Sequence, residues 1–497
     1  MRHALGRRAD CCLSPIEIEM SGDHMNNELT ALTTIFTEFY YWVTVVMMFL
    51  IHAGLLAYEF GVTRPKNLNQ TLVRHTMSLA LVTVTWFLFA WWIYWAFNNG
   101  PFLFGGVISN AATAAALPWA EQMGPNFQDN IQGVFWAAFL LFSWVMSAIL
   151  SGVAIERVRT GAFMILSVLV GSITWIWHAS WGWNATGWTT QLLGYHDAYA
   201  SGVIHAIAGG ACLALTIVLG PRIGKFGPNG EVREIKPHNS FLSVLGLFII
   251  YTGFWGFYAA CNIPIVDVSR DAETVRFAAT TIYGTPTTLS AITFNFLMSL
   301  AGGLMAAYVV SRGDPFWTLS GGLAGIIAAS AGNDLYHPLI SMFIGASGAA
   351  IAFKLHHYVE RRFRIDDPVG AIAVHGYAGV WGLIVCGFVL WGYPAAPAAP
   401  DVQNWAGSVG WLGTTPAGDP AINPIGMIIG AVLTFGLFGF LATWVVAKVL
   451  QRMGILREPF EVELAGADTW HNRDIYPYGA GVVTEFEAVE RNEAARF

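Results

Sequence analysis

Two histidines in matching settings are the residues of this chain best suited to chemistry. His205 in GVIHAIAGG and His375 in AVHGYAGVWG each begin a His-x-x-Ala-Gly motif inside a long apolar segment. An imidazole offers one hydrogen-bond donor and one acceptor, so a pair can bind a small polar solute or pass a proton along. Ionisable residues inside a membrane are costly and usually mark a pathway. The alternative is that each histidine only packs against a neighbouring helix.

Small residues follow both histidines, including Gly209 and Gly210 in one segment and Gly376 and Gly379 in the other. Such residues let helix backbones approach closely, which narrows any passage between them. An intact cation in such a passage would meet a desolvation penalty on the order of 20 kcal/mol in an idealised low-dielectric medium. The pattern therefore favours passage of a small neutral solute, or separate transport of a proton and a base.

The composition is that of a polytopic membrane protein. The 497 residues are 55% hydrophobic and 11% charged, with a mean hydropathy of +0.52. This is more apolar surface than a soluble core of that length needs. The net charge of −7 gives no basic stripe for nucleic acid, and the five scattered cysteines form neither a disulfide framework nor a zinc pattern.

Apolar stretches of about 20 residues mark the helices that must position the histidines. They predict an all-α membrane domain over residues 31–450. We expect eleven spans, near 31–58, 76–99, 131–153, 162–183, 199–220, 240–261, 286–311, 316–332, 337–355, 369–392 and 424–448. Residues 1–30 would form a dispensable N-terminal tail, 393–424 an outer loop and 451–497 a C-terminal tail.

The charges of the connecting loops orient these spans. Alternate connections hold fourteen basic residues, namely Arg64, Lys66, Arg74, Arg157, Arg159, Arg222, Lys225, Arg233, Lys236, Arg312, Lys354, Arg361, Arg362 and Arg364. The opposite connections hold only Arg270 and Arg276. Because basic loops stay in the cytoplasm, we expect the N-terminus outside and the C-terminal tail inside.

This orientation suggests an inverted repeat. His205 lies about seven residues into a span entered from outside, and His375 about seven residues into a span entered from inside. Five spans separate the two, and an odd offset inverts the second copy. We therefore expect a repeat at 31–220, an inverted repeat at 240–392 and an extra helix at 424–448, with both histidines near the midplane.

Ordered motifs along the chain carry a specific resemblance. They are IHAGLLAYEFGVTRPKN, SGVAIERVR, HASWGW, DAYASGVIH, GFWGF and DDPVGAIAVHGYAGVWG. On these motifs the chain resembles the Amt/Mep/Rh family of ammonium transporters from about residue 30 to residue 478. The resemblance implies eleven spans with an inverted five-plus-five repeat, a homotrimer with one pore per subunit, and transport of ammonium or ammonia without a cofactor or enzymatic activity.

The resemblance also implies roles for individual residues of the pore. The family's twin pore histidines correspond to His205 and His375. The pair of phenylalanines that stack as a gate above them corresponds to Phe142 in FLLFSW and Phe257 in GFWGF. Most of the 33 phenylalanines must pack in the core or face lipid, so the resemblance and not the spacing singles out this pair.

Three further residues correspond to the family's outer recruitment site. Trp181 matches the tryptophan that holds ammonium by cation–π attraction, worth about 2 kcal/mol when desolvated. Asp197, eight residues before His205, matches a buried supporting carboxylate, although it stands where a helix N-cap is also expected. Cys261 replaces the usual serine with a weaker hydrogen-bonding thiol. An interfacial belt position is the alternative role for Trp181.

The sequence thus predicts an ammonium transporter of the plasma (inner) membrane. Alternatives are an ammonium sensor of the same fold and an Rh-like neutral-gas channel. A metal or redox membrane enzyme is disfavoured, because no ligand spacing surrounds either histidine, and no metal site is expected. The tail ELAGADTWHNRDIYPY loosely resembles the family's cytoplasmic tail, which helps bind PII-type signalling proteins. Glu59 and Gly370 match one large branch of the family.

The predicted topology can be tested by cysteine accessibility on a cysteine-free background. A cysteine at Ser408, in the 393–424 loop, should react with an impermeant reagent from outside. A cysteine at Ser240, at the start of a span entered from the basic side, should react only after permeabilisation. Labelling of both positions from the same side would show that the span count is wrong and the repeat is not inverted.

Overall fold

A computed structural model describes most of the chain. It covers residues 15–98, 111–124, 132–184, 186–268, 275–282, 285–395 and 420–471, and gives only the backbone course at 15–30, 111–112, 132, 265–268, 275–279, 286 and 471. The helices are α1 (Pro15–Val62), α2 (Leu68–Thr85), α3 (Trp91–Ala96), α4 (Ala111–Ala115), α5 (Gln132–Ala154), α6 (Thr160–Leu169), α7 (Trp175–Gly182), α8 (Trp188–Leu193), α9 (Ile207–Leu219), α10 (Ser240–Ala260), α11 (Leu289–Ser311), α12 (Pro315–Ala329), α13 (Pro338–Phe363), α14 (Ala378–Val389), α15 (Pro424–Ala431), α16 (Ala442–Arg452), α17 (Phe460–Ala465) and α18 (Ala467–His471).

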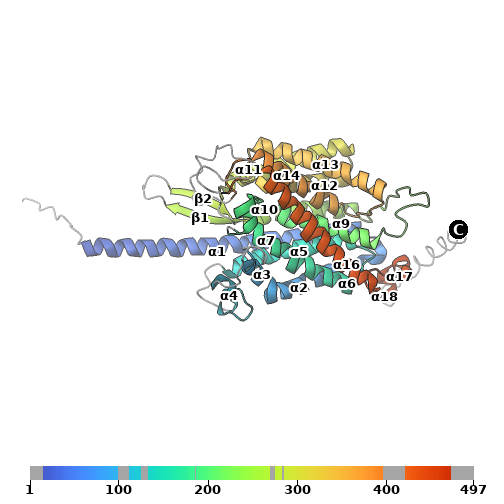
Figure 1. Cartoon of the computed structure of the whole chain (residues 1–497), viewed down its shortest axis with the longest axis horizontal. Coiled ribbons are helices and arrows are strands. Elements are labelled where there is room, and N and C mark those ends of the chain that lie inside the picture. Colours follow the sequence, from blue (N-terminus) through green and yellow to red (C-terminus); the bar gives the residue numbers. More distant parts are fainter. Residues whose placement is uncertain are drawn as a thin grey trace, which may run out of the picture.

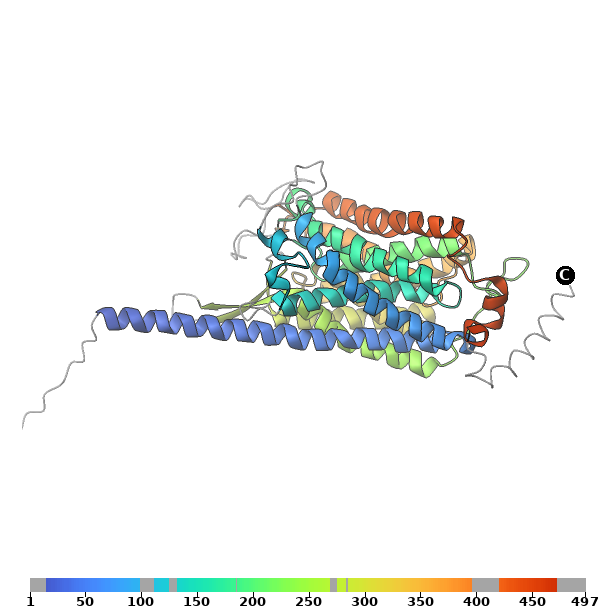
Figure 2. The same cartoon turned by 90° about the horizontal axis from the view of Figure 1, so that it is seen from below.

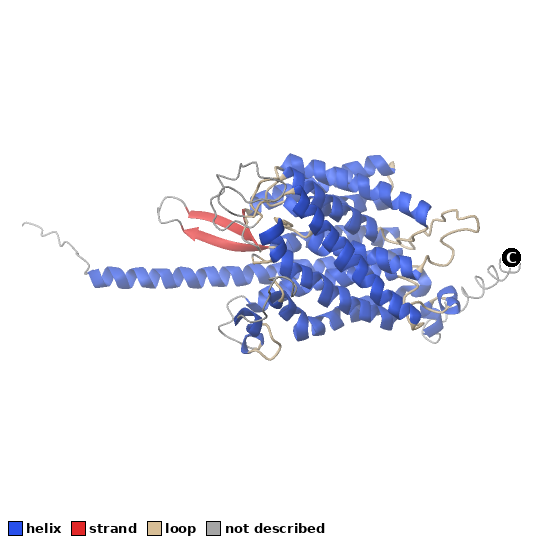
Figure 3. Cartoon of the chain, viewed as in Figure 1, coloured by secondary structure: helices blue, strands red, loops and turns tan. Residues whose placement is uncertain are grey.

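The long helices form one elongated bundle, with α1 packed along α10 and with α11, α12 and α13 packed on one another (Figures 1 and 3). Five of the membrane-length helices contain a π-helical segment. These segments are Trp86–Ala90, Val170–Thr174, Ser201–Ala206, Ile372–Tyr377 and Val432–Leu441, and each continues into the α-helix that follows it. Within the described residues, ten helices are long and apolar enough to cross a membrane. The predicted helical membrane architecture is confirmed.

The eighth predicted span is the exception. Residues 316–332 were expected to cross, and the structure has α12 there, 15 residues long, followed by a 3-10 turn at Ser330–Gly332. At 1.5 Å per residue, α12 is about 22 Å long, which is less than the ~30 Å hydrocarbon thickness. The helix is nevertheless largely buried and packs against α11, α13 and α14. The count of eleven spans therefore stays a prediction.

Two features lie outside the sequence-based expectation. A small antiparallel sheet of β1 (Asn262–Val268), β2 (Val275–Thr281) and β3 (Pro286–Thr287) occupies the connection between α10 and α11. Its strands are rich in β-branched residues, which favour extended backbone. In addition, α1 begins at Pro15 and projects beyond the bundle on the same side as this sheet (Figure 2). Part of the predicted tail is therefore helical, whereas Ser408 lies outside the described residues.

Several helices begin at a side-chain cap of the expected kind. Asn239, Thr288, Asp314 and Asn423 each accept a hydrogen bond from a backbone N–H in the first turn of α10, α11, α12 and α15, respectively. Such caps satisfy N–H groups that have no partner within the helix. Each of these polar residues directly precedes the apolar run of its helix and so marks where that helix begins.

Buried ion pairs tie the connections at the other end of the bundle together. The guanidinium of Arg64 binds Glu156, and Asp366 accepts hydrogen bonds from Arg157 at 3.1 Å and from Arg222 at 2.8 Å. Burial alone would raise the pKa of Asp366, but the two guanidinium groups hold this pKa well below its ordinary value. We call this the basic end. The basic end joins loops that the charge pattern assigned to the same side of the membrane. That this side is the cytoplasm stays a prediction.

The C-terminal segment packs against the basic end. Asp468 accepts hydrogen bonds from the backbone N–H groups of Asn69 at 2.7 Å and Gln70 at 2.8 Å, at the start of α2. Arg457 pairs with Glu463 of α17 at 2.8 Å and donates to backbone carbonyls at the end of α9. Helices α17 and α18 therefore lie at the opposite end of the bundle from β1 and β2 (Figure 1).

Two aspartates cap the first turns of the helices that carry the histidines, and both do so by accepting backbone N–H groups. Oδ2 of Asp197 accepts from the N–H groups of Gly202 and Val203, both at 2.8 Å, before the π-helical segment that contains His205. The carboxylate of Asp367 accepts from the N–H groups of Ala371 and Ile372, both at 2.9 Å, before the segment that contains His375. Each aspartate precedes its histidine by eight residues, which supports a duplicated unit.

Glycines allow these two helices to cross in contact. A Cβ at Gly209 would overlap Cα of Gly376, and a Cβ at Gly379 would overlap the carbonyl oxygen of Ser201. No side chain fits between the backbones at these points. The small residues that follow the histidines therefore bring the two imidazoles within reach of each other, as the sequence predicts.

The cap at Asp197 leads to a prediction about pH. Burial raises the pKa of Asp197 from its ordinary 3.8 to about 6, although its N–H donors act in the opposite direction. The folded state therefore holds this proton more tightly than the unfolded chain, so stability falls as pH rises from about 4 to about 6. Asp197→Asn keeps an acceptor for both N–H groups without the charge. We expect the variant to gain up to ~3 kcal/mol over wild type at pH 8 and little at pH 4.

Thermal unfolding of detergent-purified protein between pH 4 and pH 8 would measure this difference. Asp314→Asn is the matched control, because Asp314 also caps a helix, α12, but from an exposed position. A variant at position 197 that is less stable than wild type at every pH would show that the folded protein needs the charged carboxylate.

Candidate functional site

The two histidines meet in the middle of the bundle. Nδ1 of His205 lies 3.0 Å from Nδ1 of His375, and the ring centroids are 5.1 Å apart with planes 25° from parallel. His205 is fully buried and His375 is 6% exposed. At this distance one Nδ1 donates and the other accepts, so the two rings hold different tautomers. Nε2 of His205 has no hydrogen-bond partner among the described residues and is available to a solute.

Aromatic rings cover His205 on one side. The ring of Phe257 lies 5.5 Å from that of His205 and nearly parallel to it, and Phe254 lies at 5.9 Å in the same orientation. Phe142 meets Phe257 edge-on, at 4.7 Å and 89°. The predicted gate residues are therefore adjacent, but they make an edge-to-face contact instead of a parallel stack. Phe254 belongs to the same GFWGF motif and was not singled out from the sequence.

The tryptophan next to this gate is Trp183, not Trp181. The indole of Trp183 packs edge-on against Phe142 at 5.2 Å and donates to the carbonyl oxygen of Asp197 at 2.6 Å. Trp181 instead packs against Trp188 at 5.2 Å and Phe438 at 5.1 Å. The reason is local. Trp181 is in the last turn of α7, whereas Trp183 follows the end of that helix and its non-helical backbone turns the side chain toward the gate.

Cys261 lies at the end of α10, and its thiol is turned toward its own helix. Sγ of Cys261 donates to the carbonyl oxygen of Phe257 at 3.3 Å. The neighbouring Tyr258 stacks on Tyr199 at 4.2 Å, and its hydroxyl forms a hydrogen bond of 2.8 Å with Ser330. Tyr258 thus links α10 to the 3-10 turn after α12 by a hydrogen bond and to the segment before His205 by ring stacking.

A small cavity adjoins His375 on the side away from the aromatic rings. Its volume is about 20 Å³, and its lining includes His375, Val374, Gly152 and Glu59. This volume is enough for about one water-sized molecule. The lining is mostly apolar, and its polar side chains are the imidazole of His375, the carboxylate of Glu59 and the hydroxyl groups of Tyr58 and Ser320.

Glu59 is buried, with 1% of its surface exposed. Its Oε2 accepts a hydrogen bond from the Ser151 hydroxyl at 2.7 Å and lies 3.6 Å from Nδ1 of His75. The sequence analysis noted Glu59 only as a match to one branch of the family and did not place it near His375. A carboxylate at the end of an apolar span was the signal that could have identified it, because such a residue is rarely buried in a membrane protein without a function.

These parts form a line of groups through the bundle. Aromatic rings and Asp197 lie on one side of the histidine pair, and the cavity with Glu59 lies on the other. The imidazoles offer hydrogen bonds to a small neutral molecule, whereas the absence of a carboxylate between them among the described contacts gives a cation no counter-ion there. The geometry suits a neutral base and a proton that move separately.

The chain is similar in sequence to known proteins over most of its length. Residues 38–476 match the model of the Ammonium Transporter Family. An ammonium transporter of Bacillus subtilis is 28% identical over 439 residues, which cover 87% of this chain and 96% of that protein. Ammonium transporter Amt1 of Methanocaldococcus jannaschii is 27% identical over 433 residues, which cover 87% of this chain and 94% of that protein.

Solved structures show the same fold. A structure described as a sensor Amt protein has a TM-score of 0.70 at 21% identity and covers 89% of this chain and 100% of its own. Candida albicans Mep2 has a TM-score of 0.64 at 19% identity and covers 89% and 90%, respectively. The chain is a multi-pass membrane protein with no enzymatic relatives among these matches. From its sequence match and its fold, the chain belongs to the ammonium transporter family.

Proposed function

We propose that this protein takes up ammonium, removes its proton and conducts ammonia past His205 and His375. The observation that supports this most directly is the 3.0 Å contact between the two buried Nδ1 atoms, with aromatic rings stacked on His205. Such a pair can bind ammonia by hydrogen bonds but cannot replace the hydration shell of a cation. Desolvation of a bare charge there would cost on the order of 20 kcal/mol in the idealised case.

In this proposal ammonium loses its proton beside the aromatic rings that cover His205. The faces of Phe142, Phe257 and Trp183 attract a cation, at about 2 kcal/mol for a desolvated contact, which concentrates ammonium without carrying it further. We assign the recruiting indole to Trp183 because it touches the gate. Asp197 supports the site by holding the indole and the start of the helix that carries His205.

The proton follows the imidazoles in this proposal. A proton accepted at Nε2 of His205 releases the proton on Nδ1 to His375, whose other nitrogen then delivers a proton to the cavity. Glu59 lines the same cavity and accepts it, directly or through one water molecule. Ammonia and the proton then leave on the same side, and the net cargo is ammonium.

Two partners belong to the proposal. We expect a homotrimer with one pore per subunit, as is general for the family. A PII-type protein would bind at the basic end, where α17 and α18 are already fastened to the start of α2 by Asp468. This end would face the cytoplasm under the predicted topology.

The histidine pair gives the first functional prediction. His205→Ala or His375→Ala should abolish selective ammonium flux in proteoliposomes while the oligomer remains folded, because the hydrogen-bonding path is broken. His52→Leu is the control, since His52 is also buried but its ring packs edge-on against Phe49 and Trp144. Wild-type flux and selectivity in both pore variants would show that the histidines only pack. Leakage of potassium would show that they also exclude hydrated cations.

Glu59 gives the second functional prediction. Glu59→Gln keeps the acceptor for Ser151 but cannot take a proton, so the ammonium-evoked current on a solid-supported membrane should fall at least ~10-fold, equivalent to about 1.4 kcal/mol in barrier height. The flux of neutral ammonia, followed by stopped-flow pH change, should persist. Ser151→Ala is the control that removes only the hydrogen bond. An undiminished current in Glu59→Gln would place the proton route elsewhere.

A further inference from the structure

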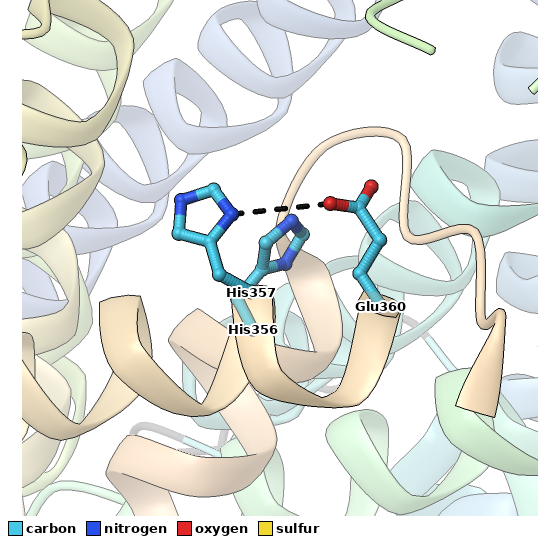
Figure 4. Close-up of side chains that lie close together, drawn as sticks. All are labelled: His356, His357 and Glu360. Carbon is cyan, nitrogen blue, oxygen red and sulfur yellow. Dashed lines mark ion pairs between the residues drawn. The ribbon is translucent and has the colours of Figure 1, made fainter. Parts of the chain in front are cut away.

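A second group of histidines lies away from the pore, near the end of α13. His356, His357 and Glu360 stand on one turn of this helix, and one ligand atom from each lies within 4.8 Å of the others (Figure 4). Nδ1 of His357 is 3.9 Å from Oε2 of Glu360. The three belong to the motif HHYVE, which the sequence analysis did not single out.

The donor set is one that transition metals prefer. Two imidazoles and one carboxylate are the three protein ligands of many zinc sites, which leave a fourth position for water. Residues three and four apart on a helix share a face, so Glu360 can meet both histidines without any change of backbone. The present separations exceed those of a bound site, so binding requires the side chains of His357 and Glu360 to rotate toward the ion.

Surrounding groups orient each candidate ligand. Nζ of Lys225 binds Oε1 of Glu360 at 2.6 Å, which leaves Oε2 facing His357. The ring of His356 packs on Trp317, with centroids 4.6 Å apart. Such outer contacts hold metal ligands in place in known sites.

The site is also accessible and electrostatically suitable. The side chain of His357 is 32% exposed, whereas those of His356 and Glu360 are about a tenth exposed, so an ion has a route from solvent to a mostly buried position. Oδ2 of Asp367 lies 3.7 Å from Nδ1 of His356. Two carboxylates therefore face a bound divalent cation, against one ammonium from Lys225.

We propose that His356, His357 and Glu360 form a binding site for a divalent transition metal of the zinc type. The alternative is an ion-pair network in which Lys225 and Glu360 only fasten the loop after α9 to α13. The site is independent of the proposed transport function, because its test measures metal binding and not flux. It lies next to Asp367, which caps the helix of His375.

Equilibrium dialysis of the tag-free full chain with Zn²⁺ at neutral pH tests the proposal. Wild type should bind one more Zn²⁺ per chain than His357→Ala or Glu360→Gln, or bind it at least ~10-fold more tightly, as loss of one ligand requires. His337→Ala is the matched control, since His337 stands at the other end of the same helix. Equal stoichiometry and affinity in wild type and both variants would overturn the proposal.

A cysteine substitution gives a spectroscopic readout that does not depend on counting ions. His357→Cys should again bind the metal, and its Co²⁺ complex should show a thiolate-to-metal charge-transfer band that wild type lacks. The same band should be lost in His357→Cys combined with Glu360→Gln. A cobalt spectrum without this band in the folded single variant would show that residue 357 does not reach the ion, and would also overturn the proposal.

Discussion

The contact between two imidazoles in an apolar interior governs the rest of this structure. A buried polar group costs free energy unless it is hydrogen-bonded, and in a membrane protein water is scarce in the interior. His205 and His375 satisfy each other at 3.0 Å, which is achieved only if their helices nearly touch. Glycines at the crossing, where a Cβ at Gly209 would overlap Gly376, permit that approach. The pairing and the crossing therefore depend on each other.

Both helices also begin in an unusual way that fixes their histidines. A π-helical segment opens each one, and a carboxylate eight residues before the histidine accepts two N–H groups from the first turn. The π-helical backbone changes the direction in which side chains point, and such segments are frequent at functional sites. Asp197 links this start to the gate through Trp183, and Asp367 links the other start to His356 at the basic end. The helix that carries His205 and the helix that carries His375 are thus each fixed at their start by hydrogen bonds.

The buried charged side chains described above do not lie at the contact between His205 and His375. The guanidinium groups of Arg157 and Arg222 and the carboxylate of Asp366 are buried, but they lie at the basic end, where both arginines pair with the aspartate. Glu59 is the carboxylate that reaches the cavity beside His375. Under the proposed mechanism, a cation attracted to the aromatic rings meets no opposite charge at the histidine pair, and Glu59 accepts its proton beyond them.

The sequence by itself determined the membrane class, the positions of most helices and the paired histidines. These follow from composition, from runs of apolar residues and from motifs read along the chain, all of which are local. The capping role of Asp367 was equally readable, since it precedes His375 by the same eight residues as Asp197 precedes His205.

Only the tertiary structure decided which side chains face the passage. Trp183 replaced Trp181 beside the gate because its direction depends on how α7 ends, which helical spacing does not give. Glu59 joined His375 at one cavity although more than 300 residues separate them, and no local pattern predicts such a contact. The sheet between α10 and α11 was missed because its short strands are read as loop between long apolar helices.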